Sequence, residues 1–222
     1  MSSKFTFFEP IILIGGGPVS ASQIDLARRY ATKTIAADSG ADTADAMGLD
    51  VFAVLGDLDS ISPKILAKNR DKVQKIADQD TTDFEKCIYA SDAPLYLAIG
   101  FLGGRLDHEL AALNVLAKYP DRKIILIGSE DICFFCPQKL RLDLPQNTRV
   151  SLFPLGEVTA VRSSGLGYDM VGLDMAADAR IGTSNFSTDP IIEISYQAGP
   201  LLMLLPVDHL NVVVDLLLVT KT

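Results

Sequence analysis

The chain has 222 residues, 48% of them hydrophobic and 22% charged, which allows one large or two modest domains and excludes wholesale disorder. Its net charge of −8, without a Lys- or Arg-rich run, argues against nucleic-acid binding, and an anionic substrate would need a divalent metal to screen the repulsion. The opening residues lack the apolar run of a signal peptide and only three cysteines are present, so we expect a reducing, cytoplasmic location and no membrane anchor.

The first half of the chain alternates apolar runs rich in Val, Ile and Leu with amphipathic stretches. Continuous apolar runs are typical of strands that helices cover on both faces, and their alternation with helices indicates a parallel, doubly wound sheet. Strands are expected at residues 11–14, 34–37, 51–55, 73–76, 95–99 and 124–127, and helices at 18–30, 82–90 and 107–119. We therefore expect an α/β N-terminal domain, residues 1–137, with a mostly parallel six-stranded sheet.

After residue 127 the pattern changes to short strand-like segments separated by Gly, Pro and Asn, with no convincing helix. These segments lie at residues 140–144, 149–153, 158–163, 179–184, 191–196 and 201–205. The pattern is typical of an antiparallel sandwich, so we expect an all-β C-terminal domain over residues 138–222. Residues 201–219 are the most apolar stretch, but polar residues such as Asp208 and Asp215 interrupt it, so buried strands are expected and not a membrane span.

Cys133 and Cys136 have the C-x-x-C spacing of a zinc or redox site. A second pair of ligands is missing, and the two phenylalanines between the cysteines are typical of a strand core. The structural interpretation is therefore favoured.

Ligands of a parallel sheet bind beyond the carboxyl ends of its strands, so the residues that follow each strand are candidates for a site. After the first strand, residues 15–17 are glycines, and Gly16 could let backbone amides approach a phosphate, although a tight turn explains the motif equally well. After the second strand, Asp38 could bind a ribose hydroxyl or cap the next helix, whereas Asp42 is expected only to cap.

Asp57 and Asp59 follow the third strand and form the strongest local signal. In an extended chain, alternate side chains point to the same side, so the two carboxylates would repel each other unless a cation lies between them. Mg²⁺ prefers such hard oxygen ligands together with substrate phosphates. The alternative is a solvated loop in which Asp59 or Ser60 caps a helix.

Residues 78–83 follow the fourth strand and contain three aspartates where a helix is expected to begin. Thr81 or Thr82 could cap that helix, with Asp83 in its first turn. Capping alone would not need the other two aspartates, so this second acidic turn could complete a Mg²⁺ site with the first.

Residues 100–108 follow the fifth strand and combine glycines with charged side chains. Arg105 could form bidentate bonds to phosphate oxygens. His108 could contact the ligand or instead hold Asp107, and we leave both interpretations open.

Taken in order, these motifs resemble those of the thiamine pyrophosphokinase family. The matching stretches are Asp38-Ser39-Gly40 and residues 56–60, 80–83, 100–108, 165–168 and 184–185. Some members of that family have tryptophan where this chain has Tyr168, and tyrosine stacks less strongly on a cationic ring.

The resemblance implies an N-terminal α/β domain, a C-terminal β-sandwich and a homodimer. It implies an enzyme that transfers the diphosphoryl group of ATP to the hydroxyethyl oxygen of thiamine and releases AMP, with Mg²⁺ held by Asp57, Asp59 and Asp83. The other residues that it places in the site are Gly16, Asp38, Ser39, Gly40 and Ser60 around the co-substrate, Gln79 and Asp80 near the substrate, Arg105, Asp107 and His108 at the nucleotide, and Tyr168, Ser184 and Asn185 in the thiamine pocket, reaching across the dimer interface.

Two other functions compete with this one. A diphosphokinase of the same scaffold could act on another alcohol, such as a pterin, although the aromatic Ser-Asn pocket favours thiamine. A nicotinamide-dependent oxidoreductase or a non-catalytic nucleotide-binding module is a different class, and the missing full G-x-G-x-x-G fingerprint counts against it.

Overall fold

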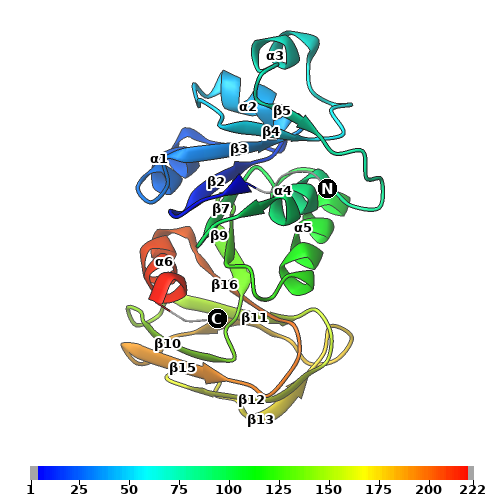
Figure 1. The fold of residues 1–222 in the computed structure, drawn as a ribbon. Coiled ribbons are helices and arrows are strands. Elements are labelled where there is room, and N and C mark those ends of the chain that lie inside the picture. Colours follow the sequence, from blue (N-terminus) through cyan, green and yellow to red (C-terminus); the bar gives the residue numbers. More distant parts are fainter. Residues whose placement is uncertain (1–4, 220–222) are drawn as a thin grey trace. The chain divides into compact units, whose positions relative to one another are not determined.

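The computed structural model describes residues 5–219 (Figure 1). Its strands form a large mixed sheet, a smaller antiparallel sheet and a two-stranded ribbon. The chain separates into two compact units, Met1–Val115 with Ile124–Ser129, and Leu116–Lys123 with Glu130–Thr222.

The first unit contains the expected alternation of strands and helices. Its strands are β2 (Ile11–Ile14), β3 (Lys33–Ala37), β4 (Ala53–Gly56), β5 (Val73–Lys75), β7 (Tyr96–Ile99) and β8 (Ile124–Ile127), and its helices are α1 (Ala21–Arg28), α2 (Gly40–Ala46), α3 (Pro63–Lys68), α4 (Asp83–Ala90) and α5 (Leu106–Lys118), whose end lies in the second unit. The strands pair in parallel in the order β8-β7-β2-β3-β4-β5. They belong to the large mixed sheet, so the expected mostly parallel six-stranded sheet describes only part of it. A short ribbon pairs β1 (Phe5–Thr6) with β6 (Ser91–Asp92).

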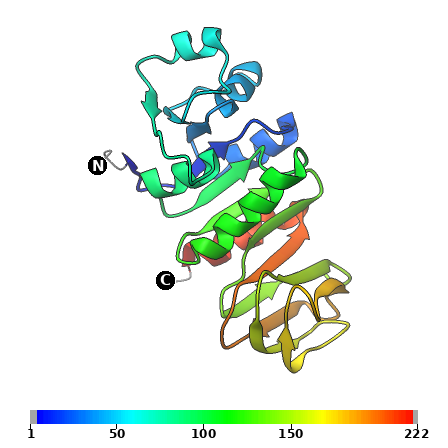
Figure 2. The ribbon, with the colours of Figure 1, turned by 90° about the vertical axis from the view of Figure 1, so that its right-hand side faces the viewer.

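The strand order reverses between β2 and β7. From β2 the chain proceeds through β3 and β4 to β5, and α4 then leads it back to β7, on the other side of β2. Right-handed crossovers in opposite directions place their helices on opposite faces of a sheet. Figure 1 shows α1 on one side of these strands and α4 and α5 on the other, and Figure 2 looks onto the side of α4 and α5. A reversal of this kind leaves a crevice at the carboxyl ends of the two neighbouring strands.

Local sequence explains where the helices begin. Ser20 and Gln23 form a capping box at the start of α1, which therefore begins three residues later than the sequence predicted. Thr82 caps α4 by accepting a hydrogen bond from the backbone N–H of Glu85. Of the two capping residues that the sequence offered, Thr81 and Thr82, the structure therefore has the second. Asp83 consequently lies in the first turn of α4.

The second unit is mainly antiparallel. One sheet has the order β10-β15-β12-β13, and the strands of the large sheet that belong to this unit follow the order β14-β11-β16-β9. Their bounds are β9 (Asp131–Phe135), β10 (Lys139–Asp143), β11 (Arg149–Pro154), β12 (Val158–Ser164), β13 (Val171–Met175), β14 (Gly182–Phe186), β15 (Ile191–Ser195) and β16 (Leu201–Pro206). Cys133 and Cys136 are free, buried thiols in and just after β9, which supports the strand-core interpretation of the C-x-x-C motif.

The prediction of strands throughout residues 201–219 is wrong. Only β16 is a strand, and the 3₁₀-helix η1 (Val207–His209) and the helix α6 (Leu210–Val219) follow it. The buried residues of α6 are Leu210, Val213, Val214 and Leu217, which is the spacing of one helical face. Asp215 therefore lies on the exposed face of α6, whereas Asp208 belongs to η1. Among the described residues, no helix is long and apolar enough to cross a membrane.

Candidate active site

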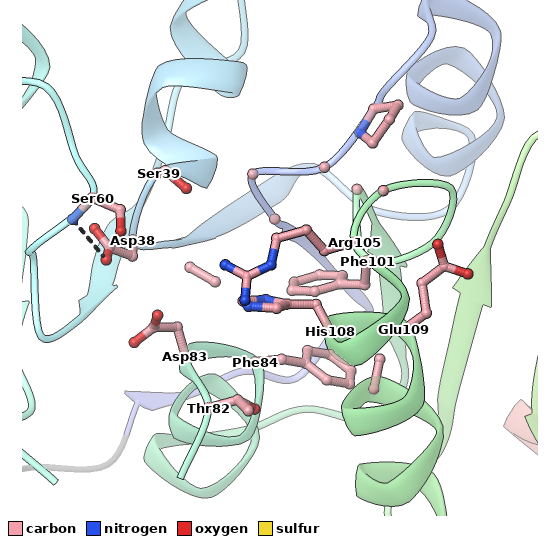
Figure 3. A pocket seen from close by; sticks show the side chains of 18 residues that line it. Asp38, Ser39, Ser60, Thr82, Asp83, Phe84, Phe101, Arg105, His108 and Glu109 are labelled. Carbon is pink, nitrogen blue, oxygen red and sulfur yellow. Dashed lines mark hydrogen bonds between the residues drawn. The ribbon is translucent and has the colours of Figure 1, made fainter. Parts of the chain in front are cut away.

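A cavity of about 580 Å³ lies at the carboxyl ends of the parallel strands in the first unit. It is lined by residues from the turn after β2, the turn after β3, the start of α4, and the loop and helix after β7 (Figure 3). Because β2 and β7 flank the reversal of strand order, the cavity occupies the crevice where this kind of sheet binds ligands.

The glycines after β2 form one edge of the cavity and touch the turn after β7. A Cβ on Gly15 or Gly17 would lie 2.6 or 2.7 Å from the carbonyl oxygen of Gly100, so neither position accepts a side chain without a shift of the backbone. Gly16 lies between them, is exposed and lines the cavity. The glycine turn is thus both tightly packed and open to a ligand. A structural turn and a phosphate-binding turn, the two interpretations of this motif, therefore do not exclude each other.

Three aspartates meet beside the cavity, and one of them, Asp38, lines it. Asp38, Asp57 and Asp59 each offer a carboxylate oxygen, and these oxygens lie within 4.8 Å of one another. Asp57 and Asp59 come together for a different reason from the expected alternation of an extended chain. Leu58 between them has a φ of +68°, and the resulting turn lets the backbone N–H of Asp59 donate to Oδ1 of Asp57 at 3.3 Å.

Asp38 is a buried carboxylate that lacks part of its expected hydrogen bonding. Only 2% of the residue is exposed, and Oδ2 accepts a hydrogen bond from the backbone N–H of Ser60 at 3.3 Å. Oδ1 is buried and has no hydrogen-bond partner among the described residues. Burial raises the pKa of Asp38 to about 6; the Ser60 N–H acts in the opposite direction, and the nearby aspartates raise it further. A cation beside Oδ1 would satisfy this oxygen, so the cluster fits a hard metal ion such as Mg²⁺.

The capping alternatives for this cluster do not hold. Ser39 occupies the N-cap position of α2, and no side-chain hydrogen bond is formed there. Ser62, and not Asp59 or Ser60, caps α3. Asp42 has a structural role, as expected, because its carboxylate accepts a hydrogen bond from the backbone N–H of Ser62 at 3.0 Å.

Asp83 lines the cavity beside the three aspartates but forms an ion pair of its own. Its Oδ1 lies 3.0 Å from Nζ of Lys86, one turn further along α4. The same ammonium group lies 3.4 Å from Oδ2 of Asp57. Asp38, Asp57, Asp59 and Asp83 are hereafter called the carboxylate wall.

Arg105 and His108 project into the cavity from the loop after β7 and from α5 (Figure 3). The guanidinium group of Arg105 makes two hydrogen bonds to Asp107, at 3.1 and 2.6 Å. Asp107 also accepts from the backbone N–H of His108 at 3.1 Å, so Asp107 and not the imidazole ring is the group that organises this loop. The cavity thus has Asp38 and Asp83 on one side, and Arg105 with Glu109 on the other.

Six of the predicted residues in the first unit are not among those that line the cavity: Gly40, Asp57, Asp59, Gln79, Asp80 and Asp107. Gln79 and Asp80 are exposed in the turn before α4. Asp78 holds this turn, because its carboxylate accepts hydrogen bonds from the backbone N–H of Asp80 and the hydroxyl group of Thr81, both at 2.9 Å.

A second cavity, of about 350 Å³, lies in the second unit and is lined in part by Tyr168 and Asn185. The Tyr168 ring is 70% exposed and packs edge-on against Phe186. The buried amide of Asn185 accepts from the backbone N–H of Tyr168 at 3.0 Å and donates to its carbonyl oxygen at 2.8 Å. Asn185 therefore positions the loop that presents Tyr168. Ser184 is exposed, with a φ of +60°, and does not line this cavity.

Two aromatic residues of the first cavity and one lysine beside it were not assigned from the sequence. Phe84 and Phe101 line it with their rings 4.3 Å apart, and Lys86 touches the carboxylate wall from within α4. Phe101 belongs to the motif of residues 100–108, and Phe84 and Lys86 directly follow the acidic turn of residues 78–83. The spacing of three residues between Asp83 and Lys86, on a helix with an acidic start, is the signal that could have identified the lysine.

The comparisons with known proteins agree on one family. A family model described as thiamin pyrophosphokinase, catalytic domain, matches residues 26–127, and one described as thiamin pyrophosphokinase, vitamin B1 binding domain, matches residues 138–201. Thiamine pyrophosphokinase 2 of Arabidopsis thaliana is 34% identical over 64% of this chain and 60% of its own length. Thiamin pyrophosphokinase 1 of Caenorhabditis elegans is 30% identical over 60% of each chain. The chain thus spans less than two thirds of the length of these relatives.

Solved structures show the same fold. Yeast thiamin pyrophosphokinase superposes with a TM-score of 0.76 at 18% identity, over 94% of this chain and 92% of its own. Thiamin pyrophosphokinase from Geobacillus thermodenitrificans superposes with a TM-score of 0.74 at 22% identity, over 89% of this chain and 97% of its own.

Proposed function

The chain belongs to the thiamin pyrophosphokinase family, and from that premise we propose that it is a thiamine diphosphokinase, which transfers the diphosphoryl group of ATP to the hydroxyethyl oxygen of thiamine. The observation that carries the proposal is the first cavity, where the carboxylate wall faces a glycine turn and Arg105. A triphosphate and a divalent ion are the ligands that this combination of charges suits. An acidic protein also suits a cationic second substrate such as thiamine.

In this proposal Asp57, Asp59 and Asp83 would hold Mg²⁺, with Asp38 as a further carboxylate of the same cluster. The bound ion screens the phosphate charges and stabilises the group in transfer. The protein itself holds the carboxylates in place, and the hydrogen bond from the backbone N–H of Ser60 to Asp38 supports that role.

The glycine turn and Arg105 bind the phosphates. Backbone amides of residues 15–17 can approach phosphate oxygens closely because no side chain intervenes, with Ser39 and Gly40 beside them. Asp107 orients the guanidinium fork of Arg105, and His108 borders the nucleotide. Positioning dominates reactions of this type. The alcohol oxygen attacks the β-phosphorus, the bond from that phosphorus to the α,β-bridging oxygen breaks, AMP leaves, and the hydroxyl proton is released.

We assign the ATP and metal site to an N-terminal domain, residues 1–137, and thiamine recognition to residues 138–222. The exposed ring of Tyr168 supports this assignment, because an aromatic face can stack on a cationic thiazolium ring. Asn185 lines the second cavity with Tyr168. In this proposal Ser184, Gln79 and Asp80, which line neither cavity, contact the substrates only when these are bound, and the protein works as a cytoplasmic homodimer.

The test is to incubate the protein with ATP, Mg²⁺ and thiamine and to quantify AMP, ADP and thiamine diphosphate. We expect AMP and thiamine diphosphate in equal amounts, and neither product after the metal is chelated. ADP in place of AMP would contradict diphosphoryl transfer. A hydroxymethyl pterin in place of thiamine tests the other substrate class, and a spectral search for bound nicotinamide tests the oxidoreductase.

A further inference from the structure

Lys86 is a charged side chain in an almost fully buried position, with 2% of its side chain exposed. It projects from α4 so that Nζ lies 3.0 Å from Oδ1 of Asp83 and 3.4 Å from Oδ2 of Asp57. Burial opposes the charge of an ammonium group, and the two carboxylates within ion-pair distance compensate for it. The side chain is therefore a fixed positive charge inside the carboxylate wall.

This charge and a divalent ion would share Asp57. Oδ1 of Asp57 already accepts the backbone N–H of Asp59, and Oδ2 accepts from Lys86. An ion bound to Asp57 would be separated from Nζ by a single carboxylate group, and like charges at so short a separation repel each other. Without an ion, the same ammonium group offsets the repulsion between the carboxylates of Asp57 and Asp83.

We propose that Lys86 is a resident counter-ion that competes with the divalent metal for Asp57 and Asp83, so that the metal binds tightly only together with the phosphates of ATP. The inference rests on the metal site of the proposed function. Before ATP binds, Lys86 keeps the carboxylates paired and in place. Phosphate oxygens then add ligands and negative charge, which offset the repulsion between Lys86 and the metal. Lys86 is thus a positioning residue and takes no part in bond making.

The experiment measures Mn²⁺ binding by electron paramagnetic resonance, with and without the α,β-methylene analogue of ATP, which cannot undergo the transfer. The wild-type chain should bind Mn²⁺ weakly alone and more tightly with the analogue. Lys86→Met removes the charge and keeps the length, so its affinity for Mn²⁺ without nucleotide should rise about tenfold or more. Lys68→Met is the matched control, because Lys68 pairs with Asp45 on the surface, and it should leave the affinity unchanged.

Unchanged or weaker Mn²⁺ binding by Lys86→Met overturns the role of Lys86. A wild-type chain that binds no Mn²⁺ even with the analogue rejects the metal site itself and the inference with it, so the two failures are distinguishable.

Stability provides a second arm if Lys86→Met folds poorly. Its melting temperature in metal-free buffer should fall, because Asp57 and Asp83 lose their counter-ion. The double variant Lys86→Met/Asp83→Asn removes one charge of each sign and should regain part of that loss. A role in packing alone would not be rescued by neutralising Asp83, so a double variant no more stable than Lys86→Met also overturns the proposal.

Discussion

The end of β4 lies directly against the Asp38 side chain, since a Cβ placed on Gly56 would be 3.0 Å from the Cβ of Asp38. The same added atom would lie 3.0 Å from Oδ1 of Asp83. Gly56 therefore occupies the space between two members of the carboxylate wall. The close approach of β3, β4 and the start of α4 depends on the absence of a side chain at this position.

Replacement Gly56→Ala should therefore push Asp38 and Asp83 away from their present positions. We expect a loss of stability of about 1–3 kcal/mol, as for other overpacked positions, together with a clear fall in the rate of AMP formation. Chemical denaturation and the AMP assay measure the two effects. Gly48→Ala is the control, because Gly48 has a φ of +67° but open space around it, so it should lose only stability.

Asp59 tests the metal site with little disturbance of the fold. It is exposed, and Oδ1 accepts a hydrogen bond from the hydroxyl group of Ser60 at 2.6 Å, which an asparagine carbonyl could also accept. Asp59→Asn should lower turnover about a hundredfold or more, because an electrostatic contribution of this type is lost. The variant should also lose any rise in melting temperature that Mg²⁺ causes in the wild-type chain. Near-normal AMP formation would show that Asp59 is not a metal ligand.

The pair of Arg105 and Asp107 is exposed, so it should matter for activity and not for stability. The two side chains are 72% and 66% exposed, and exposed ion pairs contribute about 0–1 kcal/mol. Arg105→Lys keeps the charge but loses the fork, so the KM for ATP should rise while the melting temperature stays the same. Asp107→Asn should have a smaller effect in the same direction. A large fall in melting temperature in either variant would instead indicate a structural role.

The sequence predicted most reliably those features that depend on the residues of a single helix or strand. Continuous apolar runs such as residues 11–14 predicted buried strands, and Thr82 with Asp83 predicted the start of α4, because these features depend on local chemistry. The sequence could not assign Asp38, since the choice between a cap and a ligand depends on the Ser60 backbone, which reaches it only after folding.

Other features were missed for the same physical reason. The buried position of Lys86 becomes visible only once β4 and α4 are adjacent, because its second partner, Asp57, lies on another element. The helix α6 was mistaken for strands because its apolar residues are dense enough to hide the helical period.

The three cysteines should be unreactive in the folded protein. Cys87, Cys133 and Cys136 are all buried, and burial raises the pKa of the Cys133 and Cys136 thiols to about 12, with a small further rise at Cys133 from Asp131. Because the thiolate is the reactive form, a disulfide reagent at pH 8 should label none of them without denaturant and all three in guanidinium chloride. Rapid labelling of the native chain would show that this core opens readily. Zinc retained through dialysis against a chelator would instead revive the metal interpretation of the C-x-x-C motif.

Tyr168 should determine the affinity for thiamine through its ring and not through its hydroxyl group. Tyr168 is 70% exposed and lines the second cavity, so its ring is available to a cationic substrate and contributes little to the fold. Tyr168→Ala should raise the KM for thiamine about tenfold, the size of a partly desolvated cation–π contact, and Tyr168→Phe should change it little. Tyr168→Trp should lower the KM for thiamine, since indole binds cations best.

Val171→Ala, at an exposed position that does not line the cavity, is the control. An unchanged KM with a lower melting temperature in Tyr168→Ala would mean that the ring serves only to pack against Phe186.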